Sequence, residues 1–356
     1  MTTGGLGSTS GAVSEAVARA EAQLASFWST PEGPGESAKV RASTLNYVIL
    51  CAPQDAAGYR EAAERLSETH GGRTLLLTMS GRIAAWDLVP EIHAVCRIDG
   101  SVPVCYDRVD LTFGAVAASR AESVVRTLAL PELCTVVEVG AGAPAPLVDA
   151  VATRFNRLVV DSSKTSPTTL AKLVRTATCP VADRAMIRNF AWRELTARFF
   201  DDATSALSDV RRIEIERTPV SAAQGNTQDP AALFLGWIGS RLGLRFTGRG
   251  VARDRRDELV DLMVTDDTRS DLGPGQLTAV RIRCSLGGQP LDCSIERTTA
   301  AASVRWKMRG ARQADREHAL GYHDETWVAV KAIDSTEGDA VTRAALLGAA
   351  AWEAAT

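Results

Sequence analysis

Aromatic side chains are scarce in this sequence, at 5% of its 356 residues, and the net charge is −3. Proteins that stack single-stranded nucleic acid need many such rings, and nucleic-acid binders in general carry an excess of positive charge. We therefore expect no nucleic-acid partner.

Long apolar runs are also missing. No stretch reaches the roughly 20 residues of a membrane-spanning helix. The first residues, MTTGGLGSTSGA, do not have the charged and then apolar layout of a secretory signal. We expect a cytoplasmic protein without a membrane partner.

The seven cysteines include no C-x-x-C pair. Several of them lie in apolar runs, where a free cysteine behaves as a small hydrophobe, and the cytoplasm keeps thiols reduced. We therefore expect reduced, structural thiols, with Cys105 and Cys179 as the candidates for a redox-sensitive thiol. Histidine is rarer still, and the spacing of His318 and His323 favours no single helix face, so no metal site is expected.

Familiar catalytic motifs are absent as well. The sequence contains no P-loop, no G-x-S-x-G and no H-E-x-x-H. Because no nucleophile can be paired with a nearby base, the sequence predicts no catalytic residue.

What the sequence does contain is a regular alternation of strand and helix patterns between residues 41 and 205. Such alternation predicts an α/β domain with a mostly parallel or mixed sheet. Residues 1–40 are expected to form a disordered start, a helix from Ser14 to Trp28 and a loop. Strands are predicted at 44–52, 73–79, 93–98, 108–114, 134–139 and 157–161, and helices at 55–70, 119–130, 146–155, 167–177 and 186–203.

The pattern changes after residue 205. Closely spaced alternating strands with short turns are typical of an antiparallel sheet. Residues 206–356 are therefore predicted to form an α+β domain. Its strands are expected at 211–218, 276–286, 291–298 and 302–308, and its helices at 229–243 and 336–355.

The stretch CTVVEVGAGAPAPLVDAVATRFNRLVVDSS, residues 134–163, resembles a nucleotide-binding βαβ unit, with Gly140 and Gly142 after a strand and Asp161 at the end of the next. Phosphate loops need glycines and free backbone amides at a helix N-terminus. Pro144 stands where a methyltransferase has its third glycine, and proline offers no N–H. We interpret the stretch as a tight strand-to-helix turn; the alternative is an enzyme that binds a nucleotide or S-adenosylmethionine over residues 138–161.

A basic run, RFTGRGVARDRR, covers residues 245–256. Acidic Asp254, Asp257 and Glu258 dilute its charge, which favours a solvated charged loop. The alternative is a sugar-phosphate sensor in which these arginines hold the phosphate.

Several segments in the same order are similar to one known family. They are RASTLNYVILCA (41–52), HGGRTLLL (70–77), RAESVVRTLALPEL (120–133), NRLVVDSS (156–163), IRNFAWRELTARFFDD (187–202) and PAALFLGWIGSRLG (230–243). Together they resemble the glucose-6-phosphate dehydrogenase assembly proteins (OpcA). The sequence departs from the family at residues 135–144, where a tryptophan-bearing strand end is usual, and we identify it as a divergent member.

The resemblance implies a protein without catalytic residues or a cofactor. It implies an assembly factor or allosteric activator of glucose-6-phosphate dehydrogenase, the entry enzyme of the oxidative pentose phosphate pathway and so of carbohydrate metabolism. Contact with another protein requires apolar and arginine anchors. The candidate partner-binding residues on the family-like segments are Arg41, Arg73, Trp192, Arg193, Trp237 and Arg241.

Overall fold

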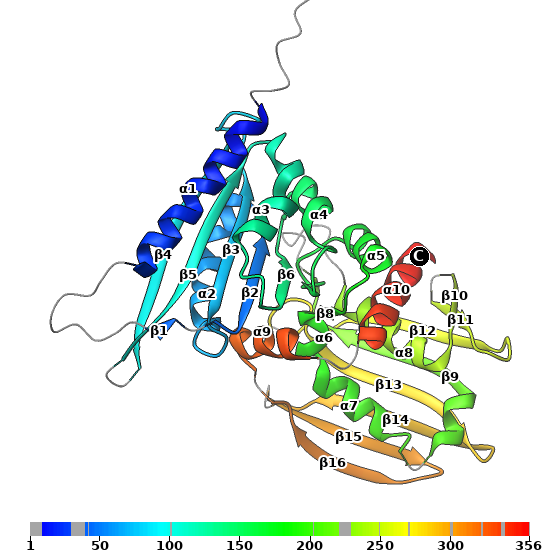
Figure 1. Cartoon of the computed structure of the whole chain (residues 1–356). Coiled ribbons are helices and arrows are strands. Elements are labelled where there is room, and N and C mark those ends of the chain that lie inside the picture. The colour runs from blue at the N-terminus through cyan, green and yellow to red at the C-terminus, as the bar shows by residue number, and fades with distance from the viewer. Residues whose placement is uncertain are drawn as a thin grey trace, which may run out of the picture. The chain divides into compact units, whose positions relative to one another are not determined.

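The computed structural model describes residues 9–29, 40–41, 43–99, 102–201, 203–220, 229–248, 250–269, 271–299, 302–321, 323–335 and 339–355. They form two compact units, each built around an eight-stranded sheet (Figure 1). The first unit runs to Asp161 and adds Thr176–Ala182 and a segment that begins at Ala329. The second unit contains the rest of the described chain. The sequence predicts a domain boundary near residue 205. In the structure the first unit ends at Asp161, and two short later segments, Thr176–Ala182 and the one that begins at Ala329, also belong to it.

The sheet of the first unit has the strand order β1-β5-β3-β2-β6-β7-β8, and β4 adds to it beside β5. β2 pairs in parallel with β3 and β6, and β4 pairs antiparallel with β5. The predicted α/β fold with a mostly parallel or mixed sheet is confirmed. The strands are β1 (Val40–Arg41), β2 (Leu45–Leu50), β3 (Gly72–Met79), β4 (Leu88–Asp99), β5 (Val102–Phe113), β6 (Thr135–Val139), β7 (Arg157–Val160) and β8 (Val181–Asp183).

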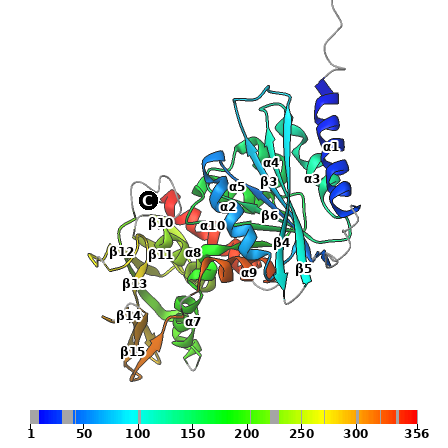
Figure 2. The ribbon, with the colours of Figure 1, turned by 90° about the vertical axis from the view of Figure 1, so that its left-hand side faces the viewer.

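Helices cover both faces of this sheet. Figure 2 shows α2 on one face and α1 and α3 on the other. All residues of β2 and of β6 are buried, which explains their continuous apolar runs. The helical elements of the first unit are α1 (Thr9–Ser29), η1 (Pro53–Asp55), α2 (Ala56–Leu66), η2 (Ala117–Arg120), α3 (Ala121–Leu128) and α4 (Ala145–Val151). α5 (Pro167–Thr176) belongs to the second unit up to Arg175, and α9 (Glu325–Asp334) is divided between the two units at Ala329.

The β4–β5 hairpin is longer than predicted. Its register pairs Leu88 with Phe113 at one end and Asp99 with Val102 at the other. The same register places Cys96 opposite Cys105, and the two form a disulfide. The expectation that every cysteine is a reduced thiol is therefore wrong for this pair, because the hairpin brings its two sulfur atoms together.

The sheet of the second unit has the order β10-β11-β12-β9-β13-β14-β15-β16. β12 pairs in parallel with β9, and the other pairs are antiparallel. The predicted α+β fold is confirmed. Its strands are β9 (Val210–Arg217), β10 (Arg245–Gly248), β11 (Val251–Arg253), β12 (Leu259–Asp266), β13 (Leu277–Leu286), β14 (Gln289–Arg297), β15 (Ser303–Gly310) and β16 (Ala314–Ala319).

Two local predictions for this unit are wrong. The sequence predicts a loop at 245–256, but Arg245–Gly248 and Val251–Arg253 form the paired strands β10 and β11. Ion pairs such as that of Arg253 with Asp257 satisfy the charges of their arginines. The helix predicted at 186–203 is broken at Asn189. The helical elements are α6 (Arg184–Arg188), α7 (Phe190–Arg198), η3 (Thr204–Asp209), α8 (Pro230–Leu242) and α10 (Asp339–Ala355).

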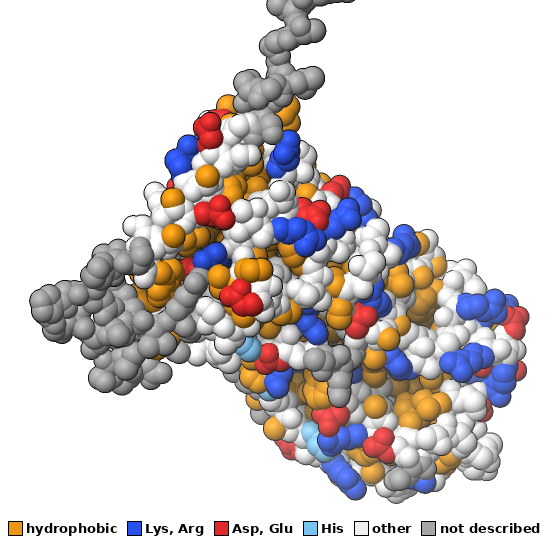
Figure 3. Space-filling model, in the orientation of Figure 1, with side chains coloured by type: hydrophobic (Ala, Val, Ile, Leu, Met, Phe, Trp, Pro, Cys, Tyr) orange, Lys and Arg blue, Asp and Glu red, His pale blue; other side chains and the backbone are white. Residues whose placement is uncertain are grey.

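The core of the second unit lies on one face of its sheet. Inward-pointing residues such as Ile213, Ile282 and Trp306 are buried, and the Trp306 ring stacks on Phe199 at 4.8 Å between centroids. Figure 3 shows basic and acidic side chains interspersed over the surface of the view in Figure 1. None of the described helices is both long and apolar enough to cross a bilayer.

Candidate functional site

The loop between β6 and α4 is the strand-to-helix turn that resembles a nucleotide site. A Cβ atom added to Gly140 would lie 2.5 Å from the hydroxyl oxygen of Tyr59, a residue of α2. The backbone N–H of Ala141 donates a 2.8 Å hydrogen bond to that hydroxyl oxygen. The Tyr59 side chain therefore fills the space above Gly140. Its hydroxyl oxygen also accepts the hydrogen bond of the Ala141 N–H, which a bound phosphate would need as a donor.

The helix after this loop adds little anion-binding capacity. α4 has only seven residues, and Pro144 precedes its first turn. The amides of Leu147 and Val148 both donate to the carbonyl oxygen of Pro144. The predicted helix of residues 146–155 is shorter than expected, and its N-terminal amides bond within the turn.

Glu138, an acidic residue on β6 of this βαβ unit, is buried. Glu138 has 1% of its surface exposed, and the Tyr47 hydroxyl donates a hydrogen bond to its Oε2. Burial, reinforced by the charge of Glu138, raises the pKa of Tyr59 well above its ordinary value. Burial also raises the pKa of the nearby Cys51 thiol to about 12, so this thiol stays protonated at neutral pH. The Tyr47–Glu138 and Ala141–Tyr59 hydrogen bonds thus satisfy buried polar groups, as in the core of a stable protein.

Four of the six predicted partner-binding residues lie in the second unit. Trp192 on α7 is buried, and the guanidinium of Arg297 lies 5.7 Å from its ring centroid. Trp237 on α8 is also buried. Both tryptophans therefore pack in the interior, while Arg241 is exposed at the end of α8.

Arg193 is the unusual member of this group. Its guanidinium lies 5.7 Å from the ring centroid of Phe190 and 5.9 Å from that of Trp237. Its Nη2 donates to the carbonyl oxygen of Met186 at 2.9 Å, but it has no ion pair with a carboxylate of the described residues. Burial lowers its pKa to about 10; Asp183 opposes that shift and Arg241 adds to it.

Phe190, which the sequence reasoning missed, lies beside this arginine. It stands at the start of α7 with 53% of its surface exposed. Its spacing of three residues before Arg193 on the helix was the available signal. We call Phe190, Arg193, Trp237 and Arg241 the arginine cluster. A cation stacked between aromatic rings, one of them exposed, is a typical anchor of protein interfaces.

Arg73 and Arg41 lie in the first unit, away from this cluster in the chain. Arg73 has 8% of its surface exposed, and its Nε and Nη2 donate to Asp107 Oδ2 at 3.1 and 2.9 Å. Asp107 also accepts a 2.8 Å hydrogen bond from Trp28 Nε1. The prediction of Arg73 as a surface anchor is therefore wrong, since it joins elements of the core. The backbone of Arg41 pairs with Cys105 in β1, and its side chain lies outside the described residues.

The predicted redox thiols are both inaccessible. Cys105 is buried in the disulfide with Cys96, and Cys179 is buried and forms no disulfide. The sequence reasoning had assigned neither a partner nor burial. Among the free cysteines of the described chain, Cys134 is the exposed one.

One group of potential metal ligands lies in the part of the chain that the structure describes. Glu91, His93 and Asp110 bring ligand atoms within 4.8 Å of one another. However, Arg60 Nε donates to Asp110 Oδ2 at 2.7 Å, and Arg108 Nε lies 3.4 Å from Oδ1. Two guanidinium groups thus already neutralise the carboxylate that a cation would need.

Comparisons with known proteins identify the family. Its models carry the description "Glucose-6-phosphate dehydrogenase subunit"; the model of the N-terminal domain matches residues 63–177, and that of the C-terminal domain matches residues 179–346. The chain belongs to this OpcA family. The OpcA likeness read from the sequence is confirmed, and it extends beyond residue 245, where the sequence segments had ended. Comparison with curated proteins gives no match.

Several solved structures are similar to this chain at low identity. An oxidoreductase from Sinorhizobium meliloti has 11% identity and a TM-score of 0.44, with 87% of this chain and 88% of that chain covered. The super-repressor mutant of Gal80p from Saccharomyces cerevisiae has 9% identity and a TM-score of 0.37, with 82% of each chain covered. An inositol dehydrogenase homolog from Azotobacter vinelandii has 10% identity and a TM-score of 0.36, with 88% and 87% covered.

Proposed function

We propose that this protein is a cytoplasmic, non-catalytic assembly factor and allosteric activator of glucose-6-phosphate dehydrogenase in the oxidative pentose phosphate pathway. The observation that carries the proposal is the match of both family domains, in order, to residues 63–346 of the chain, bar the single residue between them. An activator acts by binding one conformation of its partner more tightly than another, because only differential affinity shifts an equilibrium.

The arginine cluster is the contact site that this function favours. Burying Arg193 without a carboxylate partner opposes folding, as its lowered pKa indicates. A partner that places a carboxylate on this guanidinium would recover that energy at the interface. The exposed Phe190 ring beside it offers the apolar contact that surrounds such anchors.

Two alternative functions have less support. A nucleotide- or S-adenosylmethionine-binding enzyme would need the space that Tyr59 occupies above Gly140. A sugar-phosphate sensor would need free arginines at 245–256. There, Arg245 and Arg253 both bond to Asp257, and Arg256 lies 3.5 Å from Asp254.

The proposal is tested by titrating the full chain into purified glucose-6-phosphate dehydrogenase. We expect kcat/KM for glucose 6-phosphate to rise to a plateau, or the dehydrogenase to assemble into a larger species in sedimentation velocity. Unchanged kinetics and quaternary state at saturating amounts would overturn the function. The chain alone should show no turnover with the dehydrogenase's substrates.

The site is tested separately with Arg193→Met. This change keeps most of the apolar volume and removes the charge, and we expect the half-saturating concentration for activation to rise about tenfold or more. Arg198→Met is the matched control, since Arg198 lies on the same helix and pairs with Glu194 at 2.6 Å on its exposed side. If both variants activate the dehydrogenase equally well, the arginine cluster is not part of the interface, although the proposed function would still stand.

A further inference from the structure

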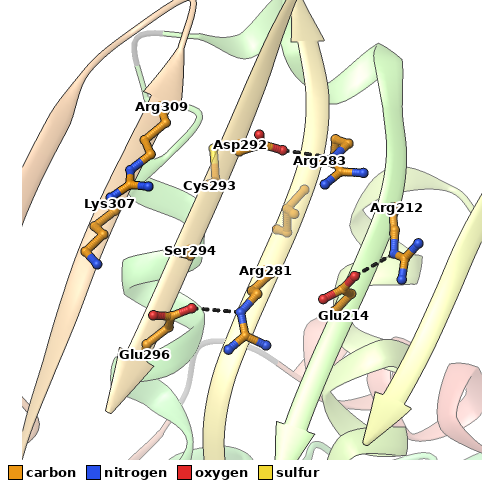
Figure 4. A pocket seen from close by; sticks show the side chains of 11 residues that line it. Arg212, Glu214, Arg281, Arg283, Asp292, Cys293, Ser294, Glu296, Lys307 and Arg309 are labelled. Carbon is orange, nitrogen blue, oxygen red and sulfur yellow. Dashed lines mark hydrogen bonds and ion pairs between the residues drawn. The ribbon is translucent and has the colours of Figure 1, made fainter. Parts of the chain in front are cut away.

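The outer face of the second sheet carries ordered charge. Alternation along each strand turns Ile213 and Ile282 into the core and their neighbours outward. Figure 4 shows the outward side chains of β9, β13, β14 and β15 on one side of the sheet. We call these side chains, with those of β16, the striped face, because each of the four strands from β13 to β16 contributes charges of one sign.

The stripes follow the strands. β13 contributes Arg281 and Arg283, and β15 contributes three basic residues; β14 and β16 contribute acidic residues only, apart from one serine. The strand registers align these residues in rows across the sheet. The rows are Arg212–Arg283–Asp292–Arg309, Glu214–Arg281–Ser294–Lys307 and Glu216–Ala279–Glu296–Arg305, and β16 adds Asp315 and Glu317.

Ion pairs within the sheet satisfy only part of this charge. Arg283 lies 2.9 Å from Asp292, and Arg281 lies 2.7 Å from Glu296. On β15, Arg305 pairs with Asp315, but Lys307 and Arg309 have no hydrogen bond or ion pair with a carboxylate of the described chain. β15 therefore has surplus positive charge. On this face β9 carries two carboxylates and one guanidinium: Glu214 lies 2.6 Å from Arg212, and Glu216 lies 3.2 Å from Arg281.

A face of this kind is complementary to itself. Consider a second copy turned by 180° about an axis that lies in the face and runs parallel to the strands, between β13 and β14. This rotation places β13 of one copy over β14 of the other and β9 over β15, and each residue then faces a residue of the same row. Arg283 then lies over Asp292 of the mate, Lys307 over Glu214, and Arg305 over Glu216. Each contact occurs twice because of the symmetry. One like-charge contact, Arg212 over Arg309, opposes these three.

Shape and size fit the same arrangement. The small Ser294 leaves a hollow among long side chains, which Figure 4 shows, and the symmetry places Arg281 of the mate over it. Six strands, β12 included, at about 4.8 Å spacing and about eight residues at about 3.3 Å each cover roughly 750 Å². A standard interface buries about 800 Å² per partner.

We propose that the striped face binds a second copy of this chain and makes the protein a two-fold symmetric dimer. The proposal is based on the charge pattern of this face, the register of its strands and the area that it covers. It therefore goes beyond the proposed function and does not depend on it.

A charge-swap experiment on the full chain tests the proposal. Lys307→Glu and Glu214→Lys each turn two attractive contacts per dimer into repulsive ones, so each variant alone should dimerise about tenfold or more weakly in sedimentation equilibrium. An equimolar mixture of the two should dimerise like the wild type, because every reversed charge then meets its opposite. Raising the salt concentration should weaken the wild-type dimer.

Arg316→Glu is the matched control. Arg316 lies on β16 between Asp315 and Glu317, so its side chain points to the other side of the strand, and dimerisation should be unchanged. A wild-type chain that is monomeric at about 100 µM, or a mixture that dimerises no better than its components, would overturn the proposal. A monomeric wild type whose Lys307→Glu variant fails to activate the dehydrogenase would assign the face to that enzyme and would equally overturn self-association.

Discussion

The hydroxyl oxygen of Tyr59 accepts a 2.8 Å hydrogen bond from the backbone N–H of Ala141. This bond joins α2 to the turn after β6, across 82 positions of the chain. In open α/β sheets, ligands bind at the carboxyl ends of the strands. Here the protein's own tyrosine occupies that place, which makes the turn part of the core.

A double-mutant cycle measures how firmly Tyr59 fills this turn. Gly140→Ala puts a methyl group 2.5 Å from the Tyr59 ring, so we expect it to lower the free energy of unfolding by about 1 to 3 kcal/mol. In a Tyr59→Ala background the clash partner is gone, and the same change should cost close to nothing. Urea denaturation of the four proteins gives the coupling. Equal costs of Gly140→Ala in both backgrounds would mean that Tyr59 does not fill the turn.

The cysteine connectivity makes a chemical prediction. Of the seven cysteines, five are free and two form the Cys96–Cys105 disulfide. Alkylation of the denatured protein without a reductant should label five thiols, and prior reduction should raise the number to seven. In the folded protein, Cys134 should react first because it alone among the free thiols of the described chain is exposed. Mass spectrometry reads all three results, and seven labels without a reductant would contradict the disulfide.

Some of this fold follows from the sequence alone. β2, β3 and β6 carry continuous apolar runs because both faces of their sheet are covered, and such runs are readable. β10 and β11 could not be predicted from the sequence, because their arginines suggest a solvated loop. Only the structure shows that Asp257 pairs with both Arg245 and Arg253. Charge content alone does not separate an exposed strand from a loop.

The candidate site was predictable to a smaller degree. The family-like segments indicated Trp192, Arg193 and Trp237 as candidates, but they did not indicate which of these side chains are buried. Arg73 carries the same signal as Arg193 in the sequence, yet Arg73 pairs with Asp107 on a neighbouring strand and no carboxylate of the described chain pairs with Arg193. Only the strand register and the helix packing distinguish a structural arginine from an unsatisfied one.

The contact between α8 and α10 depends on small residues. A Cβ atom on Gly236 would lie 2.2 Å from the carbonyl oxygen of Ala345 on the facing helix. Gly236→Ala should therefore lower the free energy of unfolding by about 1 to 3 kcal/mol through overpacking. Gly58→Ala is the matched control, because Gly58 lies within α2 with open space around its Cα, and alanine there should stabilise the protein by about 0.5 to 1 kcal/mol. Thermal melts with the same sign for both substitutions would contradict the close helix contact.

Arg193 gives the pH-dependent prediction. Burial lowers its pKa from the ordinary arginine value to about 10 in the folded protein, so the folded state disfavours the charged form. At pH 7 the side chain is charged in both states, and the penalty is present in full. From about pH 10 up to the ordinary pKa of arginine, the unfolded chain binds more protons than the folded one, so this contribution to stability rises with pH.

Arg193→Met removes that penalty. The variant should be at least as stable as the wild type at pH 7, although it loses the hydrogen bond to the Met186 carbonyl. Its advantage should shrink as the pH rises from 7 towards about 10.5, because the wild-type arginine then begins to lose its charge. Urea denaturation of both proteins across this range, with Arg198→Met as the exposed control, measures the difference. A variant that is much less stable at pH 7 would show that Arg193 is held for stability, and the case for it as a partner anchor would be lost.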